Sequence, residues 1–506
     1  MTESVSVAGG VERPAAAADG APGAGNGRRG RVLLAITMLV VAGSTVGTLL
    51  PLKPEAIGVS ACVLMLALIF LRMPVAVAMI IPGLLGMYAL RGSDLVVSTL
   101  ATLPHNQVAN WSLSVVPMFI LMGLLLWKAG LTENLYTAGR QWLGWLPGGL
   151  AVGTNIAGAG LASVSGSSVG TTYALARIGI PEMLKAGYDR RLALGSVVVA
   201  GLPGQLIPPS IMLVIYAGIA EVPIGPQLMA GIGPGILVAV LFSVMIVLFA
   251  KRWAPSPAAA AAGGAGDAPP ERVTWGRRFG SLIKIWPVPL LIAIIVAGMF
   301  SGIFTATEAG AAAAVFAVLI TAVWQRGGGA WRAIADASTA TVSSVGAIFF
   351  MLIGVEVLSR MFTLTGISTG FAQVVESMSL DRVQFLLLMT VVYVVLGTFM
   401  EPLPMMVLTI PILMPTLGAL DISLLWYGVF AVFMGELAVV TPPVGILAFI
   451  IHSITKDPEV NRGQEIGLND VFKAVWWFMP MAILVVLILI FFPEIATYIP
   501  ELTSGG

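Results

Sequence analysis

The sequence predicts an all-α polytopic membrane protein, built as an inverted-topology repeat with two re-entrant helical hairpins and two broken helices. Three observations support this fold class. The 506-residue chain is 58% hydrophobic and only 10% charged, whereas a soluble domain carries about 25% charged residues. Apolar segments long enough to cross a bilayer recur along the chain. Two of them are interrupted near their centre by adjacent prolines, Pro208-Pro209 and Pro442-Pro443.

The composition excludes several classes of function. The net charge of +1 provides no global attraction to nucleic acid, so the lipid bilayer and not a nucleic acid is the expected partner. The single cysteine, Cys62, cannot form an internal disulfide. Two histidines, His105 and His452, are too few for a histidine-rich metal site, and no cofactor is expected.

The N-terminal region is expected to lie outside the repeats. Residues 1–31 are rich in Ala, Gly and Pro and end in a cluster of arginines, which predicts a disordered tail on the cytoplasmic side. Residues 32–50 form an apolar stretch long enough for a transmembrane helix. The stretch could instead be the apolar core of a signal peptide. Because no A-x-A cleavage site follows it, we favour an uncleaved, extra N-terminal transmembrane helix.

The first repeat is expected over residues 56–250. Its residues 148–180 are apolar, with the polar sequence Ser165-Gly166-Ser167-Ser168 at the centre. Each arm is too short to span, and cationic residues flank both ends, which predicts a re-entrant hairpin that enters from the cytoplasm. The other expected elements are spans at 56–71, 74–90, 112–127 and 225–250, a surface helix at 131–146, and a broken helix at 192–220.

The break in the helix at 192–220 lies at Gly201–Ser210. Adjacent prolines remove two backbone donors, and the glycines loosen the helix around them. Unpaired backbone groups at membrane depth are tolerated only where they are buried in protein or line a polar cavity. A broken membrane helix therefore points to a substrate or ion site.

The second repeat is expected over residues 281–495, after a basic cytoplasmic linker at 251–280. Its apolar stretch at 384–418 is interrupted at Gly397–Pro402 and predicts a second hairpin, and a second broken helix is expected at 424–453 around Thr441–Gly445. Further spans are expected at 282–300, 305–324, 338–358 and 471–492. The chain then has eleven crossings and two hairpins, with a cytoplasmic N-terminus and a periplasmic C-terminus.

The two halves share one spacing. The offset that places Pro208-Pro209 on Pro442-Pro443 also places Pro181 on Pro415 and the first hairpin tip on residues 399–402. Cationic loops put the ends of the first hairpin inside and those of the second outside. Two tips and two breaks in opposite orientations should meet near the bilayer midplane. The alternative is that Pro-Pro pairs recur by chance in a chain with 32 prolines, each break being a structural kink.

The predicted meeting point offers oxygen ligands. Four serines within six residues, Ser163, Ser165, Ser167 and Ser168, lie at the first tip. Their hydroxyls, together with carbonyls freed by the breaks, suit a weakly bound alkali cation. The alternative is that each hydroxyl bonds a carbonyl of its own helix, as single serines in membrane helices usually do.

Glu401 is the most informative charge, because a carboxylate at membrane depth is a functional candidate. The alternative is that it caps the helix that begins at Pro402. Glu308 is expected to be a structural helix cap. For Glu356 and Glu436, function and helix packing are equally open.

Several motifs resemble the large membrane subunit of tripartite ATP-independent periplasmic (TRAP) transporters, over roughly residues 56–495. In chain order they are Ser165-Gly166-Ser167-Ser168, Ile180-Pro181, Gly187-Tyr188-Asp189, Ile207-Pro208-Pro209-Ser210, Gly302–Ala309, Gly397–Glu401, Pro411–Pro415 and Thr441–Gly445. The resemblance implies a sodium-driven symporter of the bacterial inner membrane with an elevator-type ion transporter architecture. It also implies a periplasmic solute-binding protein, a separate small four-helix membrane subunit, and an organic-acid substrate such as a C4-dicarboxylate or sialic acid.

The resemblance also implies site residues. Substrate contacts would fall on Ser165, Ser210 and Glu401. Sodium, the coupling ion, would be bound by residues of both tips and both breaks: Ser165, Gly166, Ser167, Ser168, Gly204, Pro208, Gly397, Thr398, Thr441, Pro442 and Gly445. Two departures from the family pattern are the Glu at 401, where the family usually has Asp, and the additional segments 32–50 and 251–280.

Other classes of protein fit less well. A stand-alone inverted-repeat carboxylate carrier, working without a binding protein, is the alternative within transport. An intramembrane enzyme would need a nucleophile beside a positioned base, yet the aspartates lie in connecting segments and the histidines at predicted loop or helix ends. A non-transporting scaffold would not need two polar tips that face two breaks.

Overall fold

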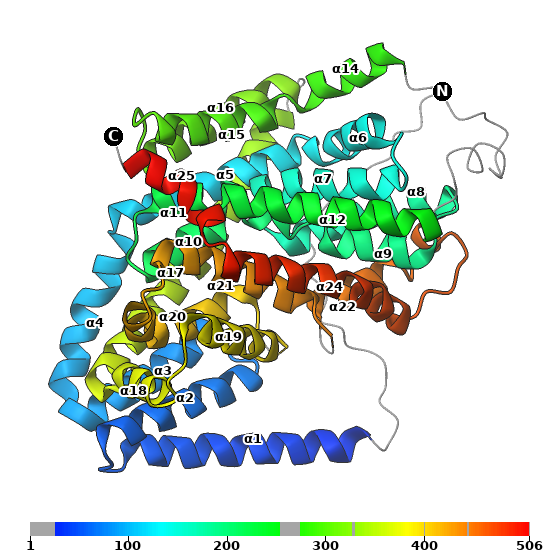
Figure 1. The fold of residues 1–506 in the computed structure, drawn as a ribbon. Helices are drawn as coiled ribbons and strands as arrows, with labels where there is room; N and C mark the ends of the chain where they lie inside the picture. The colour runs from blue at the N-terminus through cyan, green and yellow to red at the C-terminus, as the bar shows by residue number, and fades with distance from the viewer. Residues whose placement is uncertain (1–25, 254–273, 326–328, 399, 443–444, 505–506) are drawn as a thin grey trace.

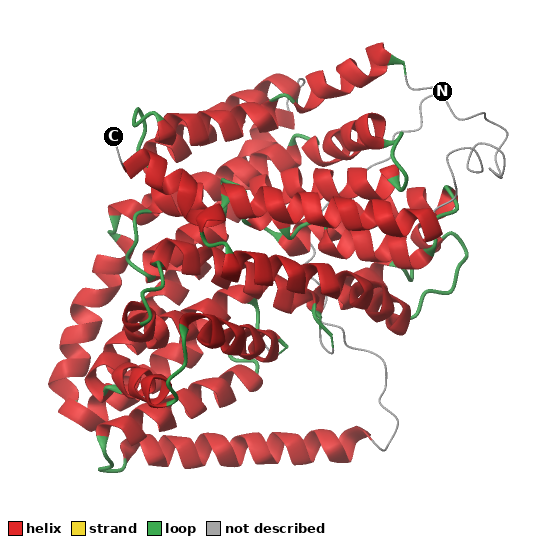
Figure 2. Cartoon of the chain, viewed as in Figure 1, coloured by secondary structure: helices red, strands yellow, loops and turns green. Residues whose placement is uncertain are grey.

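The computed structural model describes residues 26–253, 274–325, 329–398, 400–442 and 445–504. Within these ranges the chain is built of helices and contains no β-strand (Figure 2). The predicted all-α fold is therefore confirmed. Predictions for residues 1–25 and 254–273, and for Pro443 and Val444 in the second break, lie outside the described residues.

The first half of the chain is a continuous series of helices. In order they are α1 (Asn26–Leu49), α2 (Pro54–Phe70), α3 (Val75–Arg91), α4 (Ser93–Val108), η1 (Trp111–Ser114), α5 (Val115–Lys128), α6 (Leu131–Leu143), α7 (Gly149–Ser165), α8 (Ser168–Lys185), α9 (Arg190–Val199), η2 (Pro203–Gln205), α10 (Ile211–Ile219), α11 (Ile224–Ala230) and α12 (Ile232–Trp253).

The second half continues in the same manner. Its helices are α14 (Trp275–Ile285), α15 (Pro287–Phe300), α16 (Ala306–Trp324), α17 (Gly329–Thr365), α18 (Ile367–Ser377), α19 (Arg382–Gly397), α20 (Pro402–Ala419), α21 (Leu424–Val440), α22 (Ile446–Ile454), α23 (Pro458–Asn461), α24 (Leu468–Phe491) and α25 (Glu494–Ser504). Proline begins α2, α15 and α20, because the first residue of a helix needs no N–H for an intrahelical bond.

Helix boundaries recur at the offset that separates the two proline pairs. This offset places the first residues of α8, α9 and α11 on the first residues of α20, α21 and α23, respectively, and the last residue of α6 on that of α18. It also places α5 within the long helix α17. The shared spacing therefore extends from the two proline pairs to the order of the helices.

The expected hairpins and broken helices are present as secondary structure. Gly166 and Ser167 separate α7 from α8, and residues 398–401 separate α19 from α20. The first broken helix consists of α9, η2 and α10, and residues 441–445 divide the second into α21 and α22. The helices are thus interrupted at the expected positions in the described residues, and the re-entrant course of the two hairpins stays a prediction.

Several boundaries correct the predictions. α1 begins at Asn26, so that residues 26–31 are helical and do not belong to a disordered tail. Residues 275–280, expected in the linker, begin α14, which meets α15 at an angle of 51°. The residues that follow the last expected span, 471–492, form α25. α14 and α25 mix polar and apolar residues, and a helix needs only one apolar face to pack, so their composition did not reveal them.

Helix α17 is longer than the expected span at 338–358. It runs for 37 residues, because no proline interrupts the sequence and its charged residues lie toward the ends. It stops at Gly366, whose φ of 68° is in the left-handed region, a conformation that ends helices at little cost only for glycine. The short helix α18 that follows was not predicted.

The chain is a multi-pass membrane protein. By length and composition, six helices of the described residues can cross a membrane, or seven if the bent pair α14–α15 counts as one span. α2, α3, α19 and α21 are shorter apolar helices. The count of eleven crossings and the sides of the termini stay predictions.

The hairpins and breaks lie inside the helix bundle. α7, α9, α12 and α24 pack side by side through the middle of the molecule, and α1 packs on α2 and α3 at one edge (Figure 1). All residues of α9 from Leu192 to Val199 are buried, as are all residues of α21 from Trp426 to Val440. The segments next to both breaks are therefore shielded by protein and not by lipid.

Hydrogen bonds across the bundle join the two halves. The hydroxyl of Tyr216 in α10 donates to the carbonyl oxygen of Leu424 at 2.7 Å, and the amide of Gln227 in α11 donates to that of Leu425 at 3.1 Å. Gly428 permits this approach, since a Cβ there would lie 2.4 Å from the Tyr216 ring. The start of α21 is thus held by residues that follow the first break.

Gly158 and Gly160 in α7 provide a matched test of how closely the first hairpin packs against the first break. A Cβ on Gly158 would lie 2.5 Å from the carbonyl oxygen of Ala200, whereas a Cβ on Gly160 would meet only Leu135, at 3.6 Å. We expect Gly158→Ala to lower the free energy of unfolding by about 1–3 kcal/mol through overpacking. Gly160→Ala should leave it unchanged or raise it by up to about 1 kcal/mol. Thermal unfolding in detergent measures both variants, and equal midpoints would contradict the close packing.

Candidate functional site

The first hairpin tip, Ser165–Ser168, is shaped by one glycine and three hydroxyls. Gly166 ends α7 with a φ of 63°, and a Cβ at this position would lie 2.3 Å from the side chain of Ile211. Ser167 caps α8, because its Oγ accepts the N–H of Gly170 at 3.1 Å. The hydroxyls of Ser165 and Thr171 are hydrogen-bonded at 3.3 Å. The tip is therefore an ordered turn that packs against the start of α10.

Gln205 in the first break supports this tip. The residue is 1% exposed. With its side-chain oxygen turned toward the tip, that oxygen accepts the backbone N–H groups of Ser167 and Ser168, both at 3.1 Å. These N–H groups lie at the start of α8 and have no intrahelical acceptor. The break thus supplies the acceptor that the tip lacks.

Glu436 of α21 reaches the same tip from the second half. It is 3% exposed, and its carboxylate accepts a hydrogen bond from the hydroxyl of Ser168. None of the ion pairs found in the described residues involves this carboxylate. Ser168 is consequently held from two sides, by Gln205 of the first half and by Glu436 of the second.

A cavity of about 150 Å³, here named the tip cavity, lies where these elements meet. It is bordered by the first tip, the first residues of α10 and α22, the start of α20, and α21. Its lining residues are Gly166, Ser167, Ser168, Val169, Met212, Glu401, Pro402, Glu436, Val439 and Ile446. The charged side chains among them are two glutamates, and no basic side chain lines the cavity. A volume of this size holds a benzene-sized molecule.

A larger cavity of about 570 Å³, the side cavity, lies on the other side of the first tip, between α5, α7, α8 and α22. Its wall is mainly apolar, with no charged side chain and with hydroxyl-bearing residues Ser165, Ser167, Thr171, Tyr173 and Ser453. Ser167 and Val169 line both cavities. The first tip is therefore the partition between the two.

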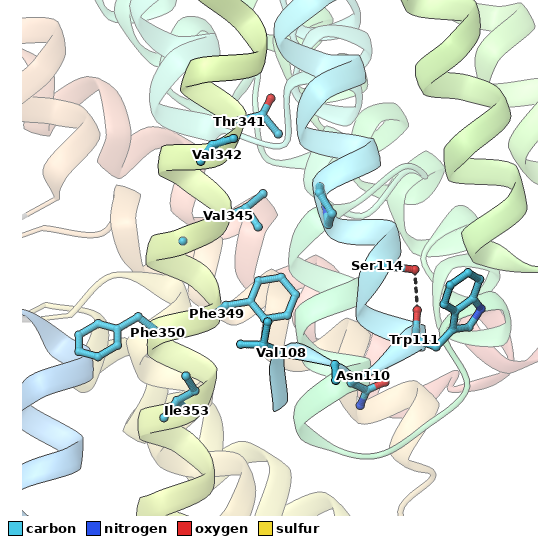
Figure 3. A pocket seen from close by; sticks show the side chains of 13 residues that line it. Val108, Asn110, Trp111, Ser114, Thr341, Val342, Val345, Phe349, Phe350 and Ile353 are labelled. Atoms are coloured by element: carbon cyan, nitrogen blue, oxygen red, sulfur yellow. Dashed lines mark hydrogen bonds between the residues drawn. The ribbon is translucent and has the colours of Figure 1, made fainter. Parts of the chain in front are cut away.

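A third cavity of about 680 Å³ lies apart from the tips, beside α17 (Figure 3). Val345 and Phe349 of α17 project toward the segment that contains Val108 and Trp111 (Figure 3). It has no charged lining side chain and shares no residue with the tip cavity. Nothing in its lining matches the polar groups expected of the site.

Four residues singled out from the sequence come together in the tip cavity: Gly166, Ser167, Ser168 and Glu401. Ser165 lines the side cavity instead. Ser210 is 1% exposed and caps α10: its Oγ accepts the N–H of Leu213 at 3.2 Å and donates to the carbonyl of Gln205. Its hydroxyl is thus already used within the first break.

The remaining predicted ion ligands do not line the tip cavity. The hydroxyls of Thr398 and Thr441 bond carbonyls of their own helices, at 3.0 Å and 2.7 Å. Gly204 packs against α7, where a Cβ would lie 2.3 Å from the Ala159 carbonyl oxygen, and Gly397 packs equally closely against Ala438. Pro208 forms a cis peptide bond with Pro209, and Pro442 and Gly445 lie in the second break.

Two residues of the site were not assigned from the sequence. Gln205 was not singled out, although a glutamine inside an apolar break was a usable signal. For Glu436, function and packing are equally open from the sequence, and the structure places it against the first tip. Glu308 forms the predicted cap with Thr305, since each side chain bonds the other's backbone N–H.

The donor set of the tip cavity suits a hard, monovalent cation. Its polar side chains are hydroxyls and carboxylates, which are oxygen ligands. Within the described residues, no group of three or more His, Cys, Asp or Glu side chains lies together. The lining therefore offers two carboxylates and two serine hydroxyls as oxygen donors.

Comparison with known proteins shows several full-length relatives. The chain is 27% identical to the C4-dicarboxylate TRAP transporter large permease protein DctM of Vibrio cholerae, over 88% of this chain and 97% of that one. It is 28% identical to the ectoine TRAP transporter large permease protein TeaC of Halomonas elongata, over 87% and 97%. It is 26% identical to the sialic acid TRAP transporter large permease protein SiaM of Vibrio cholerae, over the same shares.

A solved structure shares the fold. The Alcanivorax borkumensis YdaH transporter, described as having an unusual topology, superposes with a TM-score of 0.57 at 18% identity, over 83% of this chain and 90% of that chain. A likeness at this identity concerns the arrangement of helices alone. A family model for the DctM component of tripartite ATP-independent periplasmic transporters matches residues 62–495. Because this match covers most of the sequence, the chain belongs to the family of TRAP transporter large permease components.

Proposed function

We propose that this chain is the permease of a sodium-coupled importer, which takes a small organic acid from a periplasmic solute-binding protein. Family membership makes it a secondary transport protein and not an enzyme. The proposal adds the coupling ion, the class of substrate and the elevator-type movement. Large permeases of this family work with a binding protein and a small membrane subunit, so the partners of this chain are a periplasmic binding protein and a small four-helix membrane subunit.

The tip cavity is the observation that carries the proposal. Residues from the first tip, the second tip and both broken helices border a single space of about 150 Å³. Broken helices and hairpin tips that converge at one point inside a membrane protein are typical of ion and substrate sites in secondary transporters. The volume suits a small solute. The names of the relatives include a C4-dicarboxylate and sialic acid, both acids, but also ectoine.

An inverted-topology repeat explains how one site can serve both sides of the membrane. The recurrence of helix boundaries at one offset in the two halves supports the repeat. The distribution of cationic residues supports opposite orientations of the two hairpins, with the N-terminus in the cytoplasm and the C-terminus in the periplasm. Movement of the paired hairpins and breaks as one body would then present the tip cavity to either side in turn.

The proposed division of roles combines the lining of the tip cavity with the family resemblance. From the lining, sodium is bound near the first tip by Ser167 and Ser168. From the resemblance alone, it is bound near the second tip and break by Gly397, Thr398, Thr441, Pro442 and Gly445. Glu401 contacts the substrate or its accompanying ion from the second tip. It lines the tip cavity, and its side chain makes no hydrogen bond that would cap α20. This freedom favours a ligand-binding role over the capping role.

The coupling is tested in proteoliposomes that contain this chain, its small membrane subunit and the binding protein loaded with a labelled organic acid. We expect uptake to require an inward sodium gradient and to stop when choline replaces sodium, because the cation enters the site with the solute. Omitting the binding protein should also stop uptake. Uptake by this chain alone, independent of sodium, would instead identify a stand-alone carrier.

Glu401→Ala is expected to abolish uptake while leaving the protein folded. Glu401 lies at the start of α20, is exposed to the tip cavity and has no hydrogen-bonded partner in the described residues, so its loss removes a ligand and no packing. Uptake should fall to the background rate, because the variant lacks the carboxylate that the proposed site uses. The measurements are initial uptake rates and the thermal unfolding midpoint. A variant that transports at the wild-type rate would show that Glu401 is only a structural residue.

A further inference from the structure

We infer that Glu436 positions the Ser168 hydroxyl for sodium and supplies the negative charge of that ion's site. The inference rests on the proposed sodium coupling and extends it to a residue that neither the motifs nor the comparisons assign. It starts from the hydrogen bond between the two side chains, which joins the first tip to the second broken helix.

The direction of this hydrogen bond determines what Ser168 can do. A hydroxyl has one hydrogen to donate and two lone pairs that accept. The Ser168 hydroxyl has two acceptors within reach, the Glu436 carboxylate and, at 3.3 Å, the turned side-chain oxygen of Gln205. With its hydrogen directed to the charged carboxylate, which is the closer acceptor, the lone pairs of its oxygen are free for a cation. Ser168 and Glu436 both line the tip cavity, so such a cation would sit in that space.

The burial of Glu436 also indicates a cation beside its carboxylate. The residue is 3% exposed, and the Ser168 hydroxyl is the one hydrogen-bond donor that it has among the described residues. A carboxylate buried with a single neutral donor is costly unless a positive charge compensates it. The lining of the tip cavity contains no lysine, arginine or histidine. A buried carboxyl without a basic neighbour is either protonated or compensated by a bound cation, and the proposed sodium coupling assigns the compensating charge to sodium.

The second oxygen of the carboxylate is available to that cation. It takes part in no hydrogen bond with the described residues, and Glu436 borders the cavity. Gln205 holds the backbone of Ser167 and Ser168 from the opposite side, so the tip cannot turn away. Residues that hydrogen-bond to a metal ligand and hold its orientation typically change the affinity for the metal about 10- to 100-fold when they are mutated.

Glu436 thereby differs from Glu401, with which it shares the cavity. Glu401 is exposed at the second tip and has no bond to the first tip. Glu436 is fixed to the first tip and lies within a fully buried stretch of α21. The sodium affinity of the first tip should depend on Glu436 and on Ser168 as a pair.

The test is a sodium titration of the purified full-length chain in detergent, with choline chloride keeping the ionic strength constant. The thermal unfolding midpoint reports binding, because an ion that binds only the folded state raises it. For the wild type we expect a rise that saturates with sodium. Glu436→Gln, which keeps the shape but removes the charge, should weaken the apparent sodium affinity about 10- to 100-fold. Glu356→Gln, a membrane carboxylate outside the cavity, is the matched control and should titrate like the wild type.

Variants of Ser168 distinguish positioning from a general loss of stability. Ser168→Ala should weaken sodium affinity to a similar degree, whereas Ser168→Thr, which keeps a hydroxyl, should retain it. The double variant Ser168→Ala with Glu436→Gln should have the same apparent sodium affinity as whichever single variant binds sodium less tightly, because the two side chains act as one unit. If Glu436→Gln does not fold, Ser168→Ala alone tests the same prediction. This variant should fold, since it removes only one oxygen atom.

The outcomes separate this inference from the function on which it rests. A wild-type chain whose midpoint does not respond to sodium would overturn both. A wild type that responds, with Glu436→Gln responding equally, would overturn the role of Glu436 and leave sodium coupling intact. A purely structural role would lower the midpoint by the same amount in sodium and in choline, without moving the apparent affinity.

Discussion

The rest of the site depends on the hydrogen bonds that fix Ser168 at the first tip. Its backbone N–H is accepted by Gln205 from the first break, and its hydroxyl donates to Glu436 from the second broken helix. A helix that starts inside a membrane protein has N–H groups without acceptors, and these cannot be left to hydrocarbon. The first tip therefore depends on the polar groups that the two broken helices bring to it.

In this arrangement, the polar groups that become free where a helix is interrupted serve as groups of the site. Each broken helix and each tip has backbone groups without a partner in its own helix. Residues of both tips and both broken helices border one small space, the tip cavity, which is lined by protein. The glycines serve this convergence: Gly204 and Gly397 allow the first break and the second hairpin to approach their neighbours more closely than any side chain would permit. The first tip becomes a thin partition between the tip cavity and the side cavity.

The sequence was most informative where the physical constraint is local. Proline pairs, polar tips and long apolar stretches predicted where the helices are interrupted, because each interruption depends on the residues of its own segment. Helices α14, α18 and α25 were missed or misplaced, since a mixed composition looks like a loop until a neighbour covers the apolar face. Ser210 shows another limit: its hydroxyl was counted as a ligand, and only the folded break shows that it caps α10.

The amino-acid sequence by itself determined that this chain is a multi-pass helical protein with two interrupted helices and two polar tips, because bilayer thickness and proline chemistry act on single segments. The tertiary structure alone decided which polar groups meet. Ser168 and Glu436 are 268 positions apart, and no periodicity or spacing relates them. Their contact follows from how the two halves pack, and packing depends on the shapes of all the helices together.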